Sequence, residues 1–180
     1  MKKNELREKY KKLRNELDEF FIEKASATIT EKFIRNFSNY NSYLLYLSFN
    51  NEVRTIKLIE YLKDNGKEVF LPVVYKERLT VGCFEGFKDL VPGKYGIREP
   101  KRVSSVDNFD VVVVPGVVFD NNCYRLGYGK GYYDRFLKSI YAKVLIGFAY
   151  DFQVVEKLPV ESHDVKLDFV LTEKREIGGN

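Results

Sequence analysis

The sequence predicts an α/β fold in which helices cover both faces of a mainly parallel sheet. The run Asp-Val-Val-Val-Val-Pro at 110–115 is the strongest strand signal, because continuous β-branched residues are typical of a strand covered on both faces. Helix-like and strand-like segments alternate along the chain, and this alternation favours helices on both sides of the sheet. A length of 180 residues suffices for one such core and is short for two, so we expect a single domain spanning 1–180.

The N-terminal part of the chain predicts two helices and a strand. Apolar residues recur at spacings of three and four from residue 3 to about residue 21, which indicates a first helix. Its apolar stripe consists of Leu6, Tyr10, Leu13, Leu17 and Phe20. A second helix is expected at about 25–37, followed by a strand at 43–47 and a polar turn at 50–52.

The remaining elements follow from local signals. A helix at about 55–63 ends at the pair Asn65-Gly66, a typical stop signal. Residues 68–74 and 79–84 have strand composition, whereas the proline and glycine residues of 90–100 indicate a loop. After the strand at 110–115 we expect further elements in this order: a helix at 132–139, a strand at 144–148, a polar loop containing 161–164, and a last strand at 169–171.

The composition is that of an ordinary soluble globular protein, with 44% hydrophobic and 31% charged residues. The net charge of +4 suggests an anionic ligand more readily than a nucleic-acid surface, so we expect no nucleic-acid partner. No apolar run approaches the ~18 residues of a membrane span, so no membrane partner is expected. Cys83 and Cys123 form no CxxC pair, and no apolar stretch follows the basic N-terminus, so we expect a cytoplasmic protein.

A glycine-rich loop of about fifteen residues follows the strand at 110–115. Compact domains usually join a strand to a helix in roughly 2–6 residues, so a connection this long is usually functional. Gly127, Gly129 and Gly131 lack Cβ atoms, which lets backbone N–H groups approach an anion closely. Arg125 and Lys130 add positive charge, and the next helix begins at the same place. The loop is therefore interpreted as a phosphate cradle, although its spacing matches neither the dinucleotide fingerprint nor a P-loop and would alone suggest a surface turn.

Several polar residues are candidate ligands, and each also has an interpretation that needs no ligand. Asp134 in the first turn of the helix after the loop could hold Mg²⁺ beside phosphates or could simply favour the helix dipole, and its position supports both equally. Glu52 follows a strand end, where α/β folds place ligands, but acids in such turns are commonly solvated. His163 and Asp164 have the same ordinary interpretation as surface loop residues.

The first predicted helix carries a basic stripe. Lys3, Arg7, Lys11 and Arg14 fall on one side, while acidic residues lie on roughly the opposite side. Like charges spaced in this way repel one another, so the stripe could hold an anion at the docking edge of the helix. A solvated basic rim is the commoner explanation, and we favour it for Lys11 and Arg14 more than for Lys3 and Arg7.

The motifs together resemble the 5-formyltetrahydrofolate cyclo-ligases. The pair Phe119-Asp120 followed by the run 125–134, Arg-Leu-Gly-Tyr-Gly-Lys-Gly-Tyr-Tyr-Asp, is similar to the signature of that family. The similarity extends over the chain through these landmarks: Lys3-x-x-Leu6-Arg7, Leu47-Ser48 with Glu52, Gly96-Ile97 with Glu99-Pro100, and His163-Asp164 with Asp168. Many members of the family have a glycine where Cys123 stands, so this loop is strained if the position requires a positive φ.

The resemblance implies a three-layer α/β/α sandwich and an ATP- and Mg²⁺-dependent conversion of 5-formyltetrahydrofolate to 5,10-methenyltetrahydrofolate. Residues implied to bind ATP are Lys3, Arg7, Arg125, Leu126, Gly127, Tyr128, Gly129, Lys130, Gly131, Tyr132 and Tyr133. Residues implied to contact the folate are Leu47, Glu52, Tyr128, Gly129, Lys130, Gly131 and Tyr132. Asp134 and Asp164 are implied to ligate Mg²⁺, and Arg125 and Lys130 to act in catalysis by offsetting phosphoryl charge.

Two other functions fit part of the pattern. An RNA-binding module would explain the basic helix and the aromatic, glycine-rich loop, but it gives no reason for Asp134 or for buried parallel strands. A kinase acting on another small metabolite would keep the ATP site and change the acceptor. Whether the protein is a cyclo-ligase or such a kinase, its substrates are small molecules, and we expect it to act as a monomer.

Overall fold

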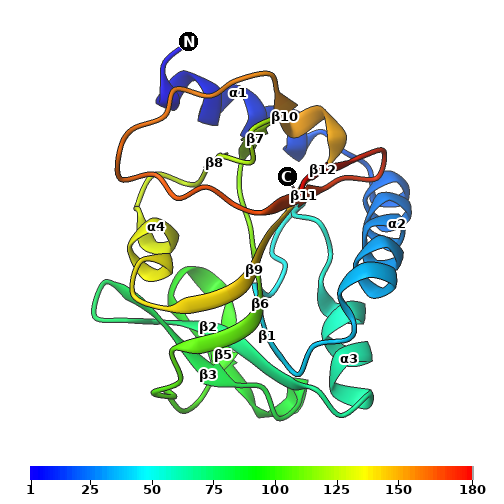
Figure 1. Cartoon of the computed structure of the whole chain (residues 1–180), viewed down its shortest axis with the longest axis vertical. Helices are drawn as coiled ribbons and strands as arrows, with labels where there is room; N and C mark the ends of the chain where they lie inside the picture. The colour runs from blue at the N-terminus through cyan, green and yellow to red at the C-terminus, as the bar shows by residue number, and fades with distance from the viewer. Residues whose placement is uncertain (180) are drawn as a thin grey trace.

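The computed structural model describes residues 1–179 and is built around a seven-stranded sheet (Figure 1). From one edge to the other, the strands are β12 (Glu176–Gly178), β11 (Phe169–Leu171), β9 (Tyr141–Phe148), β6 (Asn108–Val114), β1 (Ser42–Leu45), β2 (Glu68–Tyr75) and β3 (Arg78–Cys83). All pairs from β11 to β2 are parallel, whereas the edge strands β12 and β3 are antiparallel to their neighbours. The predicted mainly parallel sheet is confirmed.

Helices cover both faces of this sheet, which confirms the predicted α/β/α layering. Figure 1 shows α2 (Glu19–Phe37) and α3 (Ile56–Asp64) on one side and α4 (Tyr132–Leu137) on the other. Alternate residues of β6 enter different cores: Val111 and Val113 pack with α2 and α3, while Val112 and Val114 pack with α4. A strand that is buried on both faces needs the continuous valine run found in the sequence.

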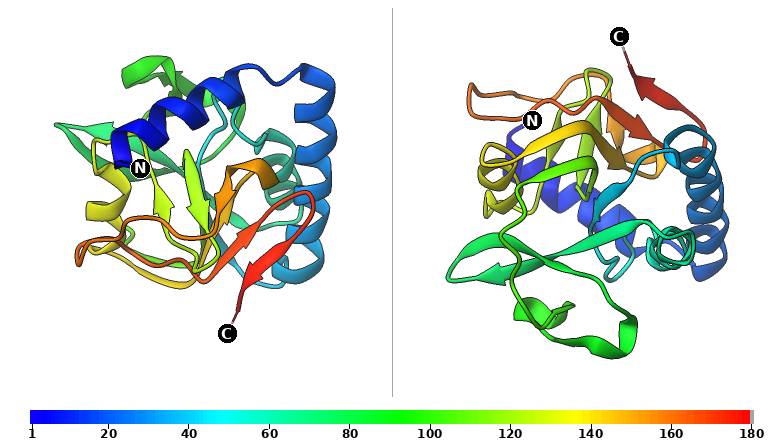
Figure 2. Two further views of the ribbon diagram at one scale, coloured as in Figure 1. Left: turned by 90° about the horizontal axis from the view of Figure 1, so that it is seen from above. Right: turned by 60° about the horizontal axis from the view of Figure 1, so that its bottom comes forward.

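The first helix, α1 (Lys3–Asn15), packs on neither face of the sheet. Its Leu6 and Tyr10 pack against an apolar cluster formed by Val117, Val118, Leu126 and Leu158. This cluster includes residues of a short antiparallel hairpin, β7 (Val118–Asp120) and β8 (Arg125–Leu126), and β10 (Val154–Val155) pairs with β7. In the view from above, α1 runs across the molecule toward the start of α2 (Figure 2).

The prediction of one helix over 3–21 is wrong. The chain breaks after Asn15, and α2 begins at Glu19, with the Asp18 side chain accepting a hydrogen bond from the Phe21 amide at 2.8 Å. An aspartate in this position satisfies a free amide at the start of a helix and so stabilises a new start. The apolar spacing continued across the break by coincidence, because Phe20 is 76% exposed and belongs to no core.

Two segments predicted as loops contain short strands. Residues 90–100 form the antiparallel pair β4 (Leu90–Pro92) and β5 (Arg98–Pro100), which projects from the sheet in the right-hand view of Figure 2. The glycine-rich loop contains β7 and β8 before its glycines. The remaining short elements are three 3₁₀ turns at Phe87–Asp89, Lys94–Gly96 and Asp151–Gln153. Within residues 1–179, no helix is long and apolar enough to cross a membrane.

Candidate active site

A cavity of about 770 Å³ lies where the carboxyl ends of β1 and β6 meet. Its walls come from the start of α1, the segments after β1 and β6, the β2–β3 hairpin and the turn between β4 and β5. Ligands of open α/β sheets bind at the carboxyl ends of the strands, and this cavity has that position. Every site residue nominated from the sequence lines it, from Lys3 and Arg7 through Leu47, Glu52 and the run 125–134 to Asp164.

The three glycines of the loop are required for different reasons. Gly129 (φ +106°) and Gly131 (φ +72°) occupy conformations that residues with a Cβ rarely adopt. Gly127 has no positive φ, but a Cβ there would lie 2.8 Å from Nη1 of Arg125. The alternating glycines therefore permit the backbone path and leave room for the arginine.

Arg125 is a buried cation with donors that no described residue accepts. Its side chain comes from β8, it is 9% exposed, and its guanidinium lies 5.3 Å from the centroid of the Tyr133 ring. Burial lowers the pKa of Arg125, and nearby Asp134 opposes that shift. Within residues 1–179, its Nε and Nη1 have no hydrogen-bond partner. Buried N–H donors are normally satisfied, so this group fits an anionic ligand in the cavity.

Two cations of α1 reach the same cavity and already have partners. Nε of Arg7 donates to the Gly127 carbonyl at 2.9 Å, which ties α1 to the glycine loop. Nζ of Lys3 lies 2.8 Å from Oε1 of Glu161 and 3.3 Å from Oδ2 of Asp164. Burial opposes the charged form of Lys3, but these hydrogen bonds outweigh it and raise its pKa.

Two carboxylates are available for a metal ion. Asp164 accepts the Glu161 amide at 2.8 Å as well as Lys3, and these contacts lower its pKa although burial opposes them. Asp134 lies in the first turn of α4, and both carboxylates are near enough to Arg125 to oppose the lowering of its pKa by burial. No cluster of three or more potential ligand side chains occurs within residues 1–179. The pair still fits Mg²⁺, which usually takes one or two protein carboxylates and keeps several waters.

The prediction that Arg14 belongs to a solvated rim is wrong. Arg14 is only 5% exposed, and its Nη2 donates to the Tyr128 hydroxyl at 2.6 Å. That hydroxyl in turn donates to Oε2 of Glu52 at 2.8 Å, and burial raises the pKa of Glu52. Lys11, one helical turn earlier, is partly exposed, with Nζ 5.7 Å from the centroid of the Tyr128 ring. The break after Asn15 sets the direction of α1 and so decides which cation enters the protein.

Sequence reasoning missed the wall opposite the glycine loop. Tyr95 and Ile97, from the turn between β4 and β5, line the cavity, and the Tyr95 and Tyr132 hydroxyls are 3.2 Å apart. Tyr132 also donates to Oε2 of Glu77 at 3.3 Å. The only signal in the sequence was the Gly96-Ile97 landmark, because proline and glycine breakers mark a turn without showing what it faces.

Comparison with known proteins decides the family. A model described as the 5-formyltetrahydrofolate cyclo-ligase family matches residues 1–173. The chain belongs to this family. It is therefore an enzyme of the ligase class.

Relatives and a solved structure agree with that assignment. The 5-formyltetrahydrofolate cyclo-ligase of Escherichia coli is 39% identical over 137 residues, covering 71% of this chain and 75% of the relative. The Haemophilus influenzae cyclo-ligase is 32% identical over 181 residues, covering 94% and 97% of the two chains. The solution structure of the Aquifex aeolicus 5,10-methenyltetrahydrofolate synthetase superposes with a TM-score of 0.89 at 34% identity, covering 99% of this chain and 93% of that one.

The structure tests the expectation of backbone strain at Cys123. Cys123 has φ +66°, so the position does require the left-handed conformation that glycine adopts most easily. Its side chain is buried, with Sγ 3.6 Å from the Ile177 carbonyl oxygen. The conformational cost is therefore accompanied by packing that a glycine would lack.

Proposed function

We propose that this cyclo-ligase converts 5-formyltetrahydrofolate to 5,10-methenyltetrahydrofolate, using ATP and Mg²⁺ and releasing ADP and phosphate. The observation that carries the proposal is the buried Arg125, whose Nε and Nη1 have no partner within residues 1–179 and which lines the cavity beside the glycine loop. A phosphate group supplies the acceptors that these donors lack. The membership of the chain in the cyclo-ligase family supplies the acceptor substrate.

The proposed ATP site combines the glycine loop with the start of α1. Lys3, Arg7 and the run 125–133 line one part of the cavity and bring cations and glycine backbone together. The proposed folate site is lined by Leu47, Glu52, Tyr128 and Tyr132, with apolar side chains from β2 and β3 nearby. A flat pterin ring favours such aromatic and apolar walls, and a buried carboxylate suits its N–H groups.

The chemistry explains why the reaction needs ATP. A formamide oxygen is a poor leaving group, so closing the ring onto the formyl carbon requires its activation. In the proposed reaction, the formyl oxygen attacks the γ-phosphorus and ADP leaves. N10 then attacks the formyl carbon and loses its proton, and the C–O bond breaks to release phosphate. The product carries a methenyl bridge between N5 and N10.

The protein's contribution is positioning and charge neutralisation, as in other phosphoryl transfers. Arg125 and Lys130 would offset negative charge on the transferred group. Asp134 and Asp164 would hold Mg²⁺, which when bound neutralises further phosphate charge. The tyrosines of the loop would cover the pterin and exclude water. We also propose that the enzyme acts as a cytoplasmic monomer on these small molecules, without nucleic acid or membrane.

An absorbance assay tests the function. Purified protein with 5-formyltetrahydrofolate and MgATP should form methenyltetrahydrofolate, which is followed in the near ultraviolet, and should form ADP in equal amounts. Omitting ATP should abolish the signal, and Arg125→Met should lower the rate by roughly 100-fold, since a charged hydrogen-bonding group at a phosphoryl site is worth several kcal/mol. As a matched control, Arg35→Met removes an exposed arginine from α2 and should change nothing.

The same experiment separates the alternatives. ADP formed without a methenyl product would contradict the proposal, because the phosphoryl group would then have passed to water or to another atom of the folate, as in a kinase with a different acceptor. Absence of both products, together with salt-sensitive retention of RNA on a filter, would favour the RNA-binding module.

A further inference from the structure

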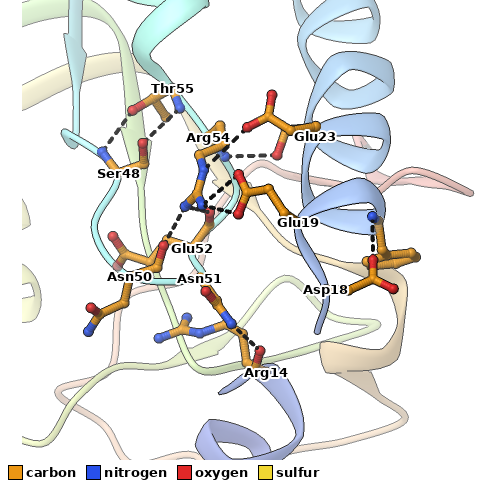
Figure 3. Close-up of polar contacts among 12 residues, drawn as sticks. Arg14, Asp18, Glu19, Glu23, Ser48, Asn50, Asn51, Glu52, Arg54 and Thr55 are labelled. Carbon is orange, nitrogen blue, oxygen red and sulfur yellow. Dashed lines mark hydrogen bonds and ion pairs between the residues drawn. The ribbon is translucent and has the colours of Figure 1, made fainter. Parts of the chain in front are cut away.

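Arg14 links three segments of the protein that are far apart in the sequence. Its Nη1 donates to the Gly116 carbonyl after β6 at 3.3 Å, and its Nη2 donates to the Tyr128 hydroxyl at 2.6 Å. Its own carbonyl accepts from Nδ2 of Asn51 at 2.9 Å, a contact drawn in Figure 3. The residue lies in the last turn of α1 and does not itself line the cavity.

The hydrogen bonds through Tyr128 have a defined direction. A phenol has one proton, and its oxygen already accepts from Arg14, so the proton is free to point at Oε2 of Glu52. The other carboxylate oxygen, Oε1, accepts the Phe49 amide at 2.8 Å. Both oxygens of Glu52 are therefore fixed from the protein side, and the residue lines the cavity.

We propose that Arg14 is a positioning residue that acts through Tyr128 to hold Glu52 as an oriented carboxylate for the substrate. This inference rests on the proposed function, in which Glu52 contacts the folate. A carboxylate fixed by two donors presents its remaining lone pairs in one direction, which suits the adjacent N–H groups of a pterin edge. Arg14 touches neither the cavity nor the reacting atoms, so its effect on binding is indirect.

Electrostatics support the same role. Glu52 is 8% exposed, and its burial raises its pKa, while Arg14 is the strongest opposing influence. The titratable and charged groups that face the Glu52 carboxylate are Arg14, Arg54, Tyr46, Tyr128, Tyr133 and Tyr150. Burial raises the pKa of each of these tyrosines, so they are neutral, and the two arginines supply the positive charge.

Arg54 is a weaker counter-ion than Arg14. Figure 3 shows its guanidinium directed at Glu19 and Glu23, and the closest nitrogen–oxygen distances are 3.3 Å and 3.7 Å. Its charge is thus shared with two acids on α2. Arg14 has no carboxylate of its own among the described salt bridges, so its charge is available to Tyr128 and Glu52.

The inference predicts a change in pH dependence. In Arg14→Met the pKa of Glu52 rises further, so the acid limb of kcat/KM for 5-formyltetrahydrofolate moves to higher pH. At neutral pH the KM for the folate rises roughly tenfold, the effect of losing one charge-assisted contact, and the KM for ATP changes little. Arg14→Lys keeps the charge but loses the forked geometry, so it recovers part of the shift. The matched control Arg54→Met moves the acid limb of kcat/KM less than Arg14→Met does.

A titration without substrate makes the test independent of activity. Protein labelled with ¹³C at the glutamate carboxyl carbons, with the Glu52 signal assigned through Glu52→Gln, reports the protonation of Glu52 in wild type, Arg14→Met and Tyr128→Phe. We expect its titration to move to higher pH in both variants, and Tyr128→Phe serves if Arg14→Met does not fold. If wild type lacks cyclo-ligase activity, the proposed function fails whatever the titration shows. Active wild-type enzyme with an unmoved Glu52 titration and an unmoved acid limb overturns the role of Arg14 alone.

Discussion

Two buried arginines beside the cavity differ in what they bind. Arg14 donates through both Nη atoms, to Tyr128 and to the Gly116 carbonyl, and only its Nε lacks a partner within residues 1–179, so it serves the protein's own structure. Arg125 keeps two donors without a partner in the described residues, and it lines the cavity. A buried guanidinium with unpaired donors at a cavity wall indicates a missing ligand, whereas one whose two Nη atoms both donate to protein atoms indicates a support. The sequence pointed to Arg125 through its loop, but it could not reveal Arg14, whose burial depends on the angle of α1.

At Asp134 the account predicts a loss of activity without a loss of fold. Asp134→Asn replaces a proposed Mg²⁺ ligand with a neutral amide, so turnover should fall by roughly 100-fold and the Mg²⁺ concentration needed for half-maximal rate should rise. The midpoint of thermal unfolding should stay close to that of wild type. Asp107→Asn, which alters an exposed carboxylate away from the cavity, is the control. Wild-type turnover with unchanged Mg²⁺ dependence would refute the assignment.

Cys123 offers a test of backbone strain. Its φ of +66° favours glycine, so Cys123→Gly should be more stable than Cys123→Ala by about 1 kcal/mol, although both lose the same sulfur. The other cysteine is the matched control: Cys83 lies in β3, where the order should reverse and alanine should be more stable by roughly 0.5–1 kcal/mol. Urea unfolding of the four variants measures both differences. The same order at both positions would mean that Cys123 is not strained.

At the scale of elements, α1 is the piece that the sequence described least well. Its apolar spacing ran on into α2, and only the Asp18 cap marks the break. The sequence also predicted a loop at 90–100, but this stretch pairs as β4 and β5 and supplies a wall of the cavity. These features depend on contacts between distant segments, such as the Val74 amide donating to Oε2 of Glu99 at 3.1 Å, which local signals cannot predict. The three glycines of the loop lie at the cavity wall, and their alternating spacing is a local signal that the sequence does carry.

The position of α1 predicts different consequences for its cations. Arg7→Ala removes the contact with the Gly127 carbonyl and should weaken ATP binding by roughly tenfold, with a smaller effect on folate binding. Lys11→Ala removes only a partly exposed contact with the Tyr128 ring, so affinity for either ligand should change by less than about threefold. Calorimetric titration of both ligands, with Arg35→Ala as the control, measures these changes. Equal losses at Arg7 and Lys11 would instead indicate a general effect of surface charge.

At the scale of the whole molecule, the strands were predictable and their order was not. The valine run of β6 predicted a strand buried on both faces. In the structure, β6 lies inside the sheet between β1 and β9. Nothing local shows that β1 pairs with both β6 and β2, or that β3 and β12 run antiparallel at the edges. The cavity exists because this order brings the ends of β1 and β6 together. The motifs therefore nominated the candidate site residues, and the fold brings these candidates to one cavity.

The fate of the formyl oxygen tests the proposed function most directly. If ATP phosphorylates that oxygen, it must leave as part of the phosphate, whichever residues hold the nucleotide. We would label the formyl group of 5-formyltetrahydrofolate with ¹⁸O, run the reaction with MgATP, and measure the mass of the released phosphate. The account predicts one labelled oxygen per phosphate, with ADP formed in step with the methenyl product. Unlabelled phosphate would contradict it, because ATP would then be hydrolysed without activating the formyl group.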